Sequence, residues 1–493
     1  MFRGKKLLCV ATAALMAVPM MFTGCKSTGS TDTSSKKPVT LTIWLAGDSQ
    51  QGTSRIEQAV NDHLKSLKGV GSNISIKLQM MGWGDDFETK ATNMFTSGGS
   101  DADVVFTSNW VDKYRQNASN GYFEPLTKYL KTSEGQEITK ILGEDFLNAS
   151  RIKGVNYGLP TNKEKAHDWG FLVRSDLFKK YGMDATKIKS ITDMEPYFEK
   201  AKADGVFALD IAALDSPWHL LDWDMVGDDL LPAAIDASTG KIVNPFTADK
   251  SVALYKQMVG YYNKGYISKD ATASQGIDAD LKTGKYFCGV DSLKPGKDKE
   301  ESASTGVDYT QIDITNIVKS NRETTGAMLA INKFSTHKQD AFNLIYLLYT
   351  DKTLINLINF GQQDKDYSVG SNGSITMTKG SDYAFAQGWM FGDQFKDLLL
   401  GTEDPQKWSN FEAYNKKGTA LKSLGFMYDD TSTQTQEAAL INIVKTYYKQ
   451  LLAGQADVDK TVAEMTSKLN AAGESTLLAD IQKQYDTFLS SKK

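Results

Sequence analysis

The chain has 493 residues, of which 41% are hydrophobic and 24% are charged, and its formal net charge is -4. This length exceeds what one hydrophobic core usually supports, so we expect two or more lobes. The lack of a basic excess and of nucleic-acid-binding motifs argues against DNA or RNA as a partner. After residue 25, no apolar run is long enough to span a bilayer.

The first 24 residues predict a signal peptide. A basic start with Arg3, Lys5 and Lys6 is followed by a nearly uncharged apolar stretch at 7–22. Phe22-Thr23-Gly24-Cys25 then resembles a bacterial lipobox, whose usual first residue is Leu. The resemblance implies cleavage before Cys25 and lipidation of its sulfur with palmitate-type chains. Two acyl chains hold a protein stably at a membrane. The alternative is an apolar anchor helix that is retained.

Residues 25–38 predict a flexible tether, because they are polar, rich in Ser and Thr, and have nothing to bury. Lipidated Cys25 would then hold the protein at the outer face of the bacterial cytoplasmic membrane. Of the other two cysteines, Cys9 lies in the removed segment. Cys288 therefore has no intrachain disulfide partner, and we expect a buried small hydrophobe there.

The body of the chain opens with alternating strand and helix patterns. Val39–Leu45 alternates apolar and polar residues, as a half-buried strand does. A helix capped by Ser54, a strand at Ile74–Met80, a helix from about Asp85 and a strand at Asp103–Phe106 follow. This β-α-β-α-β order predicts a parallel sheet with right-handed crossovers.

The rest of the chain repeats this pattern less regularly and ends in helices. Strands are expected at 171–173, 286–290 and 326–331, and helices at 251–262 and from a Ser335 cap through Tyr349. The last quarter predicts helices at 435–452, 458–472 and 478–489. Gly454 and Gly473 end the first two of these, because glycine readily adopts the left-handed conformation that closes a helix.

Six segments, taken in their order and spacing, resemble the extracellular solute-binding proteins of sugar-type ABC importers (family 1). They are Thr40-Leu-Thr-Ile-Trp44, Ala102-Asp-Val-Val-Phe106 with Asn120-Gly-Tyr-Phe-Glu-Pro-Leu126, Gly154-Val-Asn-Tyr-Gly-Leu-Pro160, Phe171–Gly182, Thr283-Gly-Lys-Tyr-Phe287 and Ala330–Ala341. Nearly the whole mature chain is covered. Gly425-Phe-Met-Tyr-Asp429 and Tyr447–Gly454 further resemble the closing domain of a subgroup of Gram-positive lipoproteins, a domain of unknown function. At Gly361–Tyr367 the chain departs from the pattern, which puts a ligand role there in doubt.

The resemblance implies an α/β fold of the two-lobed, periplasmic-binding-protein-like kind (class II type). Each lobe is a sheet flanked by helices, with extra helices at the C-terminus. Lobe I is expected at 39–160 plus 325–378, and lobe II at 161–324 plus 379–493. About three crossing segments would join the lobes, with the ligand in the cleft between them.

Sugars combine apolar C–H faces with a rim of hydroxyl groups, so a sugar site needs aromatic platforms together with carboxylates and amides. Such side chains at predicted strand ends and near the first hinge are our candidate ligand contacts, because ligands bind beyond the carboxyl ends of strands in open α/β sheets. They are Trp44, Asp48, Trp83, Asn109, Trp110, Asn162, Lys163, Trp169, Trp218, Asp222, Trp223, Asp291 and Trp389. Trp110 and Trp169 lead this set. Alternation within the first strand could instead direct Trp44 into the core.

No motif predicts catalysis, a cofactor or a bound metal. Asp222–Asp228 imitates the start of a calcium-binding EF-hand loop, but Ala233 stands where that loop needs Glu. Ser216, His219 and Asp222 lie too close together in sequence for the convergent geometry of a hydrolase triad. A pair such as Asp222 with Asp291 could only be guessed as the two carboxylates of a glycoside hydrolase.

The predicted function is therefore that of a monomeric, lipid-anchored substrate-binding protein. It would capture a small polar solute, an oligosaccharide or alternatively a peptide, by closure of its lobes. It would then deliver the solute to ABC permease subunits. The alternatives are a secreted glycoside hydrolase, and a surface adhesion or sensory protein that uses the same fold.

Overall fold

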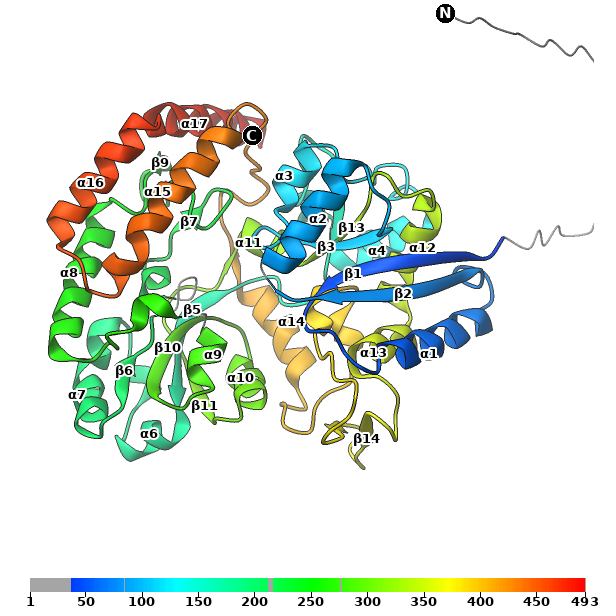
Figure 1. Ribbon diagram of the computed structural model, residues 1–493, viewed down its shortest axis with the longest axis horizontal. Helices are drawn as coiled ribbons and strands as arrows, with labels where there is room; N and C mark the ends of the chain where they lie inside the picture. The colour runs from blue at the N-terminus through cyan, green and yellow to red at the C-terminus, as the bar shows by residue number, and fades with distance from the viewer. Residues whose placement is uncertain (1–36, 84, 212–215, 275–276, 493) are drawn as a thin grey trace, which may run out of the picture. The chain divides into compact units, whose positions relative to one another are not determined.

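The computed structural model describes residues 37–83, 85–211, 216–274 and 277–492. The predicted signal peptide (1–24), and Cys25 with most of the predicted tether (25–38), lie outside these residues. The described chain forms a mixed α/β structure with two main sheets, each flanked by helices (Figure 1). No helix in this part of the chain combines the length and the apolar character needed to cross a membrane.

The first sheet contains the strands expected at the start of the chain. Its order is β2-β1-β3-β13-β4. The strands are β1 Val39–Ala46, β2 Ile74–Met81, β3 Val104–Thr107, β4 Gly158–Pro160 and β13 Met328–Ile331. β1 runs parallel to β2 and β3, which confirms the predicted parallel sheet, whereas β13 is antiparallel to β3 and β4.

Helices cover this sheet and bury its apolar side chains. They include α1 Thr53–Ser66, α2 Asp85–Ser97, α4 Ser133–Leu142, α12 Lys338–Thr350 and α13 Lys352–Phe360. On α1, Ile56, Val60 and Leu64 are completely buried, and burying such a side chain contributes about 1.5–3 kcal/mol. The resulting first core draws its side chains from 39–159 and 327–391. We call this body the first lobe.

The second sheet has the order β11-β5-β10-β6. Its strands are β5 Asp168–Arg174, β6 Phe207–Leu209, β10 Tyr286–Leu293 and β11 Tyr309–Asp313. β5 is antiparallel to both β10 and β11. Cys288 is completely buried in β10, as expected.

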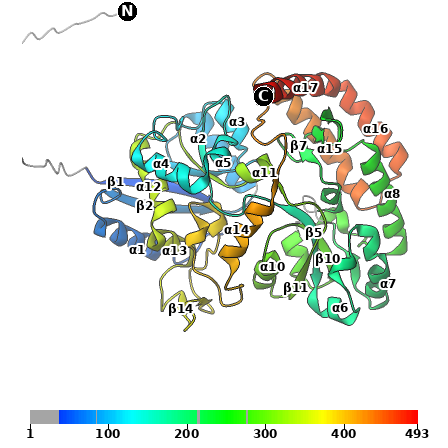
Figure 2. The same ribbon diagram turned by 180° about the vertical axis from the view of Figure 1, so that it is seen from behind.

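The second core combines this sheet with the C-terminal helices. It takes side chains from 169–312 and 426–485, and we call this body the second lobe. The helices are α8 Asp249–Lys264, α15 Gln434–Leu452, α16 Val458–Ala471 and α17 Glu474–Ser491. Both ribbon views place α16 beside α8 (Figures 1 and 2). The predicted C-terminal helices are therefore confirmed, although α17 begins four residues earlier than expected.

The remaining α-helices and strands have 11 residues or fewer. They are α3 Tyr114–Ser119, α5 Glu144–Asn148, α6 Ser175–Lys180, α7 Glu195–Ala203, α9 Ile277–Leu281, α10 Lys297–Thr305, α11 Asn321–Thr324, α14 Lys407–Lys417, β7 Asp224–Met225, β8 Ala234–Asp236, β9 Lys241–Val243, β12 Val318–Lys319, β14 Tyr367–Val369, β15 Ile375–Met377 and β16 Thr419–Ala420.

Two expectations about local structure are wrong. Ser335 does not cap α12, because its hydroxyl donates to Asp103 Oδ1 and the helix begins three residues later. Ser54 lies inside α1, whose cap position is Gly52. In both cases a tertiary contact or a neighbouring turn displaces the start of the helix by one to three residues, which sequence patterns resolve poorly.

Three stretches connect the two cores, at 160–168, 313–326 and 392–425. They touch one another, since β12 pairs with β16 and His167 forms a bridge with Val318. The third stretch begins later than expected: Tyr383, Phe385 and Phe391, which we assigned to lobe II, pack in the first core. The Tyr383 hydroxyl also donates to the carbonyl of Ile358 in α13, which ties this segment to the first lobe.

Candidate ligand-binding site

A pocket lies between the two lobes and encloses about 1290 Å³, open solvent included. The first lobe contributes Asn109 and the start of α3, from Lys113 to Gln116. The second lobe and the connecting stretches contribute the rest of the lining, including residues 222–229, 320–322 and 426–428. A ligand in this inter-lobe pocket would touch both lobes at once.

The aromatic wall of the pocket is built around Trp169 in β5. Its indole stacks on the imidazole of His219, with ring centroids 3.8 Å apart and planes inclined by 4°. The guanidinium of Arg322 lies 5.0 Å from the same indole ring. Trp169 is only 3% exposed, so it supports this wall and presents His219 and Arg322 rather than a free ring.

Trp223 forms a second part of the wall and is half-buried. Its Nε1 donates to Ser251 Oγ, the same hydroxyl that accepts a hydrogen bond from Trp218 Nε1. The ammonium of Lys250 lies 3.4 Å from the centre of the Trp223 ring. This cation–π contact fixes the ring at the pocket.

The acidic side of the pocket comes from the turn at 222–229. Asp222 adopts a left-handed conformation (φ 53°) at the end of the short helix Pro217–Leu221, a strained backbone for a residue other than glycine. Burial raises the pKa of Asp224 from the ordinary 3.8 to about 6. Asp229 accepts from Arg322 through both carboxylate oxygens at 2.9 Å. These groups give the pocket acceptors for the hydroxyl groups of a ligand.

A hydrogen-bonded pair of side chains links two connecting stretches at the pocket, where His167 is a lining residue. His167 Nδ1 lies 2.6 Å from Glu323 Oε1, and Glu323 also accepts from the backbone and hydroxyl of Ser320. Burial alone would raise the pKa of Glu323, but the charge and hydrogen bond of His167 hold that pKa below its ordinary value. The pair therefore couples the first and second connecting stretches.

A cluster of three tryptophans lies on the first lobe. Trp83, Trp110 and Trp389 stack with ring centroids 5.8–6.1 Å apart. Trp83 is 39% and Trp110 37% exposed, whereas Trp389 is half-buried. Trp110 directly follows pocket-lining Asn109, and its Nε1 donates to the carbonyl of Gly326, next to pocket-lining Thr325. The Trp cluster therefore adjoins the pocket.

The structure thus brings together seven of the sequence-predicted contacts. Asn109, Trp169, Asp222 and Trp223 line the pocket, and Trp83, Trp110 and Trp389 form the cluster beside it. The Oδ1 atom of Asn109 is buried and accepts no hydrogen bond from the described residues.

Two tryptophans that we predicted as contacts are core residues instead. Trp44 is 9% exposed and packs in the first core. Trp218 is 1% exposed and stacks on Phe246 at 4.9 Å. Neither ring has a surface to offer a ligand.

The other four predicted contacts lie outside the pocket lining. Asp48 is exposed at the end of β1. Asn162 donates to Asp393, Lys163 pairs with Glu164, and Asp291 pairs with Lys297 at 2.9 Å. These partners satisfy the side chains near the connecting stretches, so they brace the structure. Of the guessed hydrolase pair, Asp222 lines this pocket and Asp291 does not.

Sequence reasoning missed Arg115, Arg322 and Tyr428, which all line the pocket. Tyr428 belongs to the segment Gly425–Asp429, which carried the resemblance but no expectation of a ligand role. Among the residues that the structure describes, no group of three or more His, Cys, Asp or Glu side chains is placed to hold a metal ion.

Two α/β lobes, three connecting stretches and a pocket with walls from both lobes define a ligand-binding protein of the two-lobed type. The model of the family described as bacterial extracellular solute-binding protein matches residues 52–353. The chain belongs to this family. A second model, for a domain of unknown function (DUF3502), matches residues 422–490, and we call these residues the C-terminal domain.

Known proteins resemble the chain along most of its length. A carbohydrate ABC transporter substrate-binding protein of Streptococcus pneumoniae serotype 4 (strain ATCC BAA-334 / TIGR4) is 26% identical over 471 residues, covering 93% of both chains. The N-glycan transport solute-binding protein NgtS of Streptococcus pneumoniae superposes with a TM-score of 0.80 at 25% identity, covering 93% of this chain and 100% of that one. A crystal structure of NgtS in complex with Man5GlcNAc gives a TM-score of 0.76 at the same identity and the same coverage of both chains.

Proposed function

We propose that this protein is the lipid-anchored substrate-binding protein of an ABC importer for oligosaccharides. The ligand occupies the inter-lobe pocket, the lobes close over it, and the loaded protein delivers it to the permease from the outer face of the cytoplasmic membrane. Cys25 carries the lipid, and the tether gives the lobes reach. The protein works as a monomer and performs no chemistry on the ligand.

The observation that carries this proposal is the composition of the inter-lobe pocket. Carboxylates at Asp222 and Asp224, the side chain of Asn109 and the Trp169–His219 wall surround one space. Such groups suit the hydroxyl rim and the apolar faces of a sugar. The Trp cluster beside the pocket offers rings for further sugar units, which favours an oligosaccharide over a monosaccharide.

The relatives support the same class of ligand. NgtS is an N-glycan transport protein with crystal structures in complex with Man1GlcNAc and Man5GlcNAc. We therefore propose mannose- and GlcNAc-containing oligosaccharides as the first compounds to test. A contact with both lobes gives such a ligand higher affinity for the closed form, which is the condition for it to drive closure.

The test is thermal unfolding of the purified protein with a panel of oligosaccharides and peptides. A ligand at 100 times its Kd should stabilise the folded protein by about 2.7 kcal/mol through mass action. The recovered oligosaccharide should be intact by mass spectrometry. Binding only to peptides, or release of shortened sugars, would reject the proposal.

A separate test addresses the lipid anchor. Mass spectrometry of the N-terminal peptide of the membrane-extracted protein should find cleavage before Cys25 and a diacylglyceryl group on it. A C25S variant should leave the membrane fraction or remain unprocessed. An unmodified Cys25 in the membrane-bound protein would contradict lipid anchoring and leave the proposed ligand untouched.

A further inference from the structure

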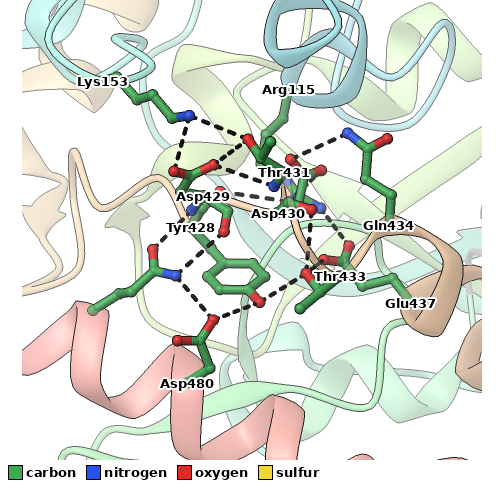
Figure 3. Close-up of polar contacts among 11 residues, drawn as sticks. Arg115, Lys153, Tyr428, Asp429, Asp430, Thr431, Thr433, Gln434, Glu437 and Asp480 are labelled. Atoms are coloured by element: carbon green, nitrogen blue, oxygen red, sulfur yellow. Dashed lines mark hydrogen bonds and ion pairs between the residues drawn. The ribbon is translucent and has the colours of Figure 1, made fainter.

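The C-terminal domain touches the first lobe through buried charges. Arg115 projects from α3 of the first lobe toward the loop before α15 (Figure 3). Its Nη1 lies 2.7 Å from Asp430 Oδ2, and its Nη2 lies 2.8 Å from Glu437 Oε2. The Arg115 side chain is 12% exposed and both carboxylates are completely buried. One guanidinium thus joins the two lobes through two carboxylates.

The second lobe holds these carboxylates in place. Thr433 donates to Glu437 Oε1 at 2.9 Å, and Leu440 on the same helix packs in the second core. The Tyr428 hydroxyl donates to Asp480 on α17 at 3.1 Å (Figure 3). The side chain of Gln484 accepts from the backbone N–H of Asp429 and donates to its carbonyl. The acceptors are therefore preorganised by α15 and α17.

The first lobe also fixes the position of the helix that carries Arg115. Tyr114 and Ala118, on either side of Arg115 in α3, are buried in the first core. The turn before α3 contains two left-handed residues other than glycine, Asp112 (φ 55°) and Lys113 (φ 28°). Such backbone persists only where the surrounding structure imposes it, and it occurs often at functional sites. This turn sets the direction in which α3 presents Arg115.

The two carboxylates stabilise the charge on the Arg115 guanidinium. Burial on its own would lower the pKa of Arg115, but the charges of Glu437 and Asp430 outweigh it and raise that pKa. Removing one partner of a buried ion pair leaves an uncompensated buried charge, so such a change is costly. The nearby pair of Lys153 and Asp429, at 2.9 Å, is 54% and 39% exposed, and exposed pairs contribute little.

The same region forms part of the pocket wall. Arg115, Met427 and Tyr428 line the pocket, and the guanidinium of Arg115 lies 5.6 Å from the centre of the Tyr428 ring. Asp430 and Glu437 are not among the lining residues. The ion pairs therefore lie directly behind the wall that both lobes share.

We propose that the C-terminal domain is the latch of the binding site: Asp430 and Glu437 capture Arg115 when the lobes close and thereby retain the ligand. This inference rests on the proposed function, since it names how closure of that pocket is held. In an open form all three groups would be hydrated, so only the difference between closed and open forms contributes to affinity. The latch acts mainly on the rate at which the ligand leaves.

The decisive variant is Glu437→Gln, because Glu437 does not line the pocket. With Man5GlcNAc as the probe, E437Q should raise Kd about tenfold, equivalent to about 1.4 kcal/mol, chiefly through faster dissociation. The matched control is D459N, which removes an exposed carboxylate that pairs with Lys256 within the second lobe. Its Kd should stay within about twofold of wild type. R115K keeps the charge, loses the two-armed geometry, and should fall between E437Q and wild type.

A wild-type Kd and dissociation rate for folded E437Q would overturn the latch while leaving the proposed function intact. Absence of wild-type binding to Man5GlcNAc and the other oligosaccharides would instead reject the proposed function. The latch is then still tested without ligand, by fluorescence energy transfer between labels at K128C and K187C. These positions are exposed on different lobes, and Cys288 is buried. E437Q should populate larger separations than wild type, and identical distributions would overturn the latch.

Discussion

Substitution of Trp110 by Ala tests whether the Trp cluster serves the ligand site. The ring stacks on Trp83 and Trp389, and 37% of the residue is exposed. For a tryptophan of about 250 Å², this fraction corresponds to about 90 Å². Complete coverage of that surface by a sugar at about 25 cal/mol per Å² contributes about 2 kcal/mol. We therefore expect W110A to weaken oligosaccharide binding by about 40-fold, or about sixfold if half the surface is covered.

The assay is titration calorimetry with the best oligosaccharide from the panel, together with thermal unfolding of each variant. Unfolding is needed because W110A also removes the hydrogen bond to Gly326 and the two ring contacts. The control is W408A, since Trp408 is a half-buried tryptophan of α14 that contacts Phe395 and lies outside both the pocket lining and the cluster. W408A should bind like wild type. A folded W110A with a Kd within about twofold of wild type would refute the reasoning from exposed area.

Three further changes separate function from stability. D224N should weaken sugar binding yet raise the free energy of unfolding at pH 7.5 by about 1–3 kcal/mol, because the half-buried carboxylate is costly when ionised above its pKa of about 6. This gain should fade in urea titrations as the pH drops from 6 to 4; a constant gain would contradict it. W218A should cost about 3–5 kcal/mol in the same assay, because Trp218 is 1% exposed. G454A should destabilise far more than G182A: both glycines have positive φ, but only at Gly454 would a Cβ lie 2.2 Å from the carbonyl oxygen of Met258. We expect about 1 kcal/mol for G182A and about 3 kcal/mol for G454A, and equal losses would show that the close contact relaxes.

Asp224 lowers the stability of the folded protein at neutral pH but supplies a carboxylate to the pocket. A half-buried carboxylate with a raised pKa is unfavourable for folding at neutral pH. The protein nevertheless places it at the pocket, beside Asp222 in a strained conformation. Groups that are kept at such expense are typical of sites where they interact with something other than the protein itself.

Much of the secondary structure follows from local patterns. The alternation of apolar residues in Val39–Leu45 predicted β1, and the register with β2 is the parallel one expected for a βαβ unit. The apolar stripe Ile56, Val60 and Leu64 predicted the buried face of α1. These features are encoded by neighbours along the chain, because strand and helix periodicities decide which side chains share a face. The sequence likewise showed aromatic and acidic residues near the ends of predicted strands.

The sequence by itself therefore determined two α/β lobes, the helical C-terminus and a set of side chains suited to a polar ligand. Only the tertiary structure decided which of them meet. Trp44 and Trp110 both lie near the end of a predicted strand, but Trp44 is buried and Trp110 is exposed. The sequence of a strand does not specify which of its side chains other parts of the chain will cover. The backbone carbonyl of Tyr428 accepts a hydrogen bond from Arg115, which lies 313 positions earlier in the chain. No local pattern specifies such a contact, since it arises from docking the C-terminal helices on one lobe while α3 is fixed in the other.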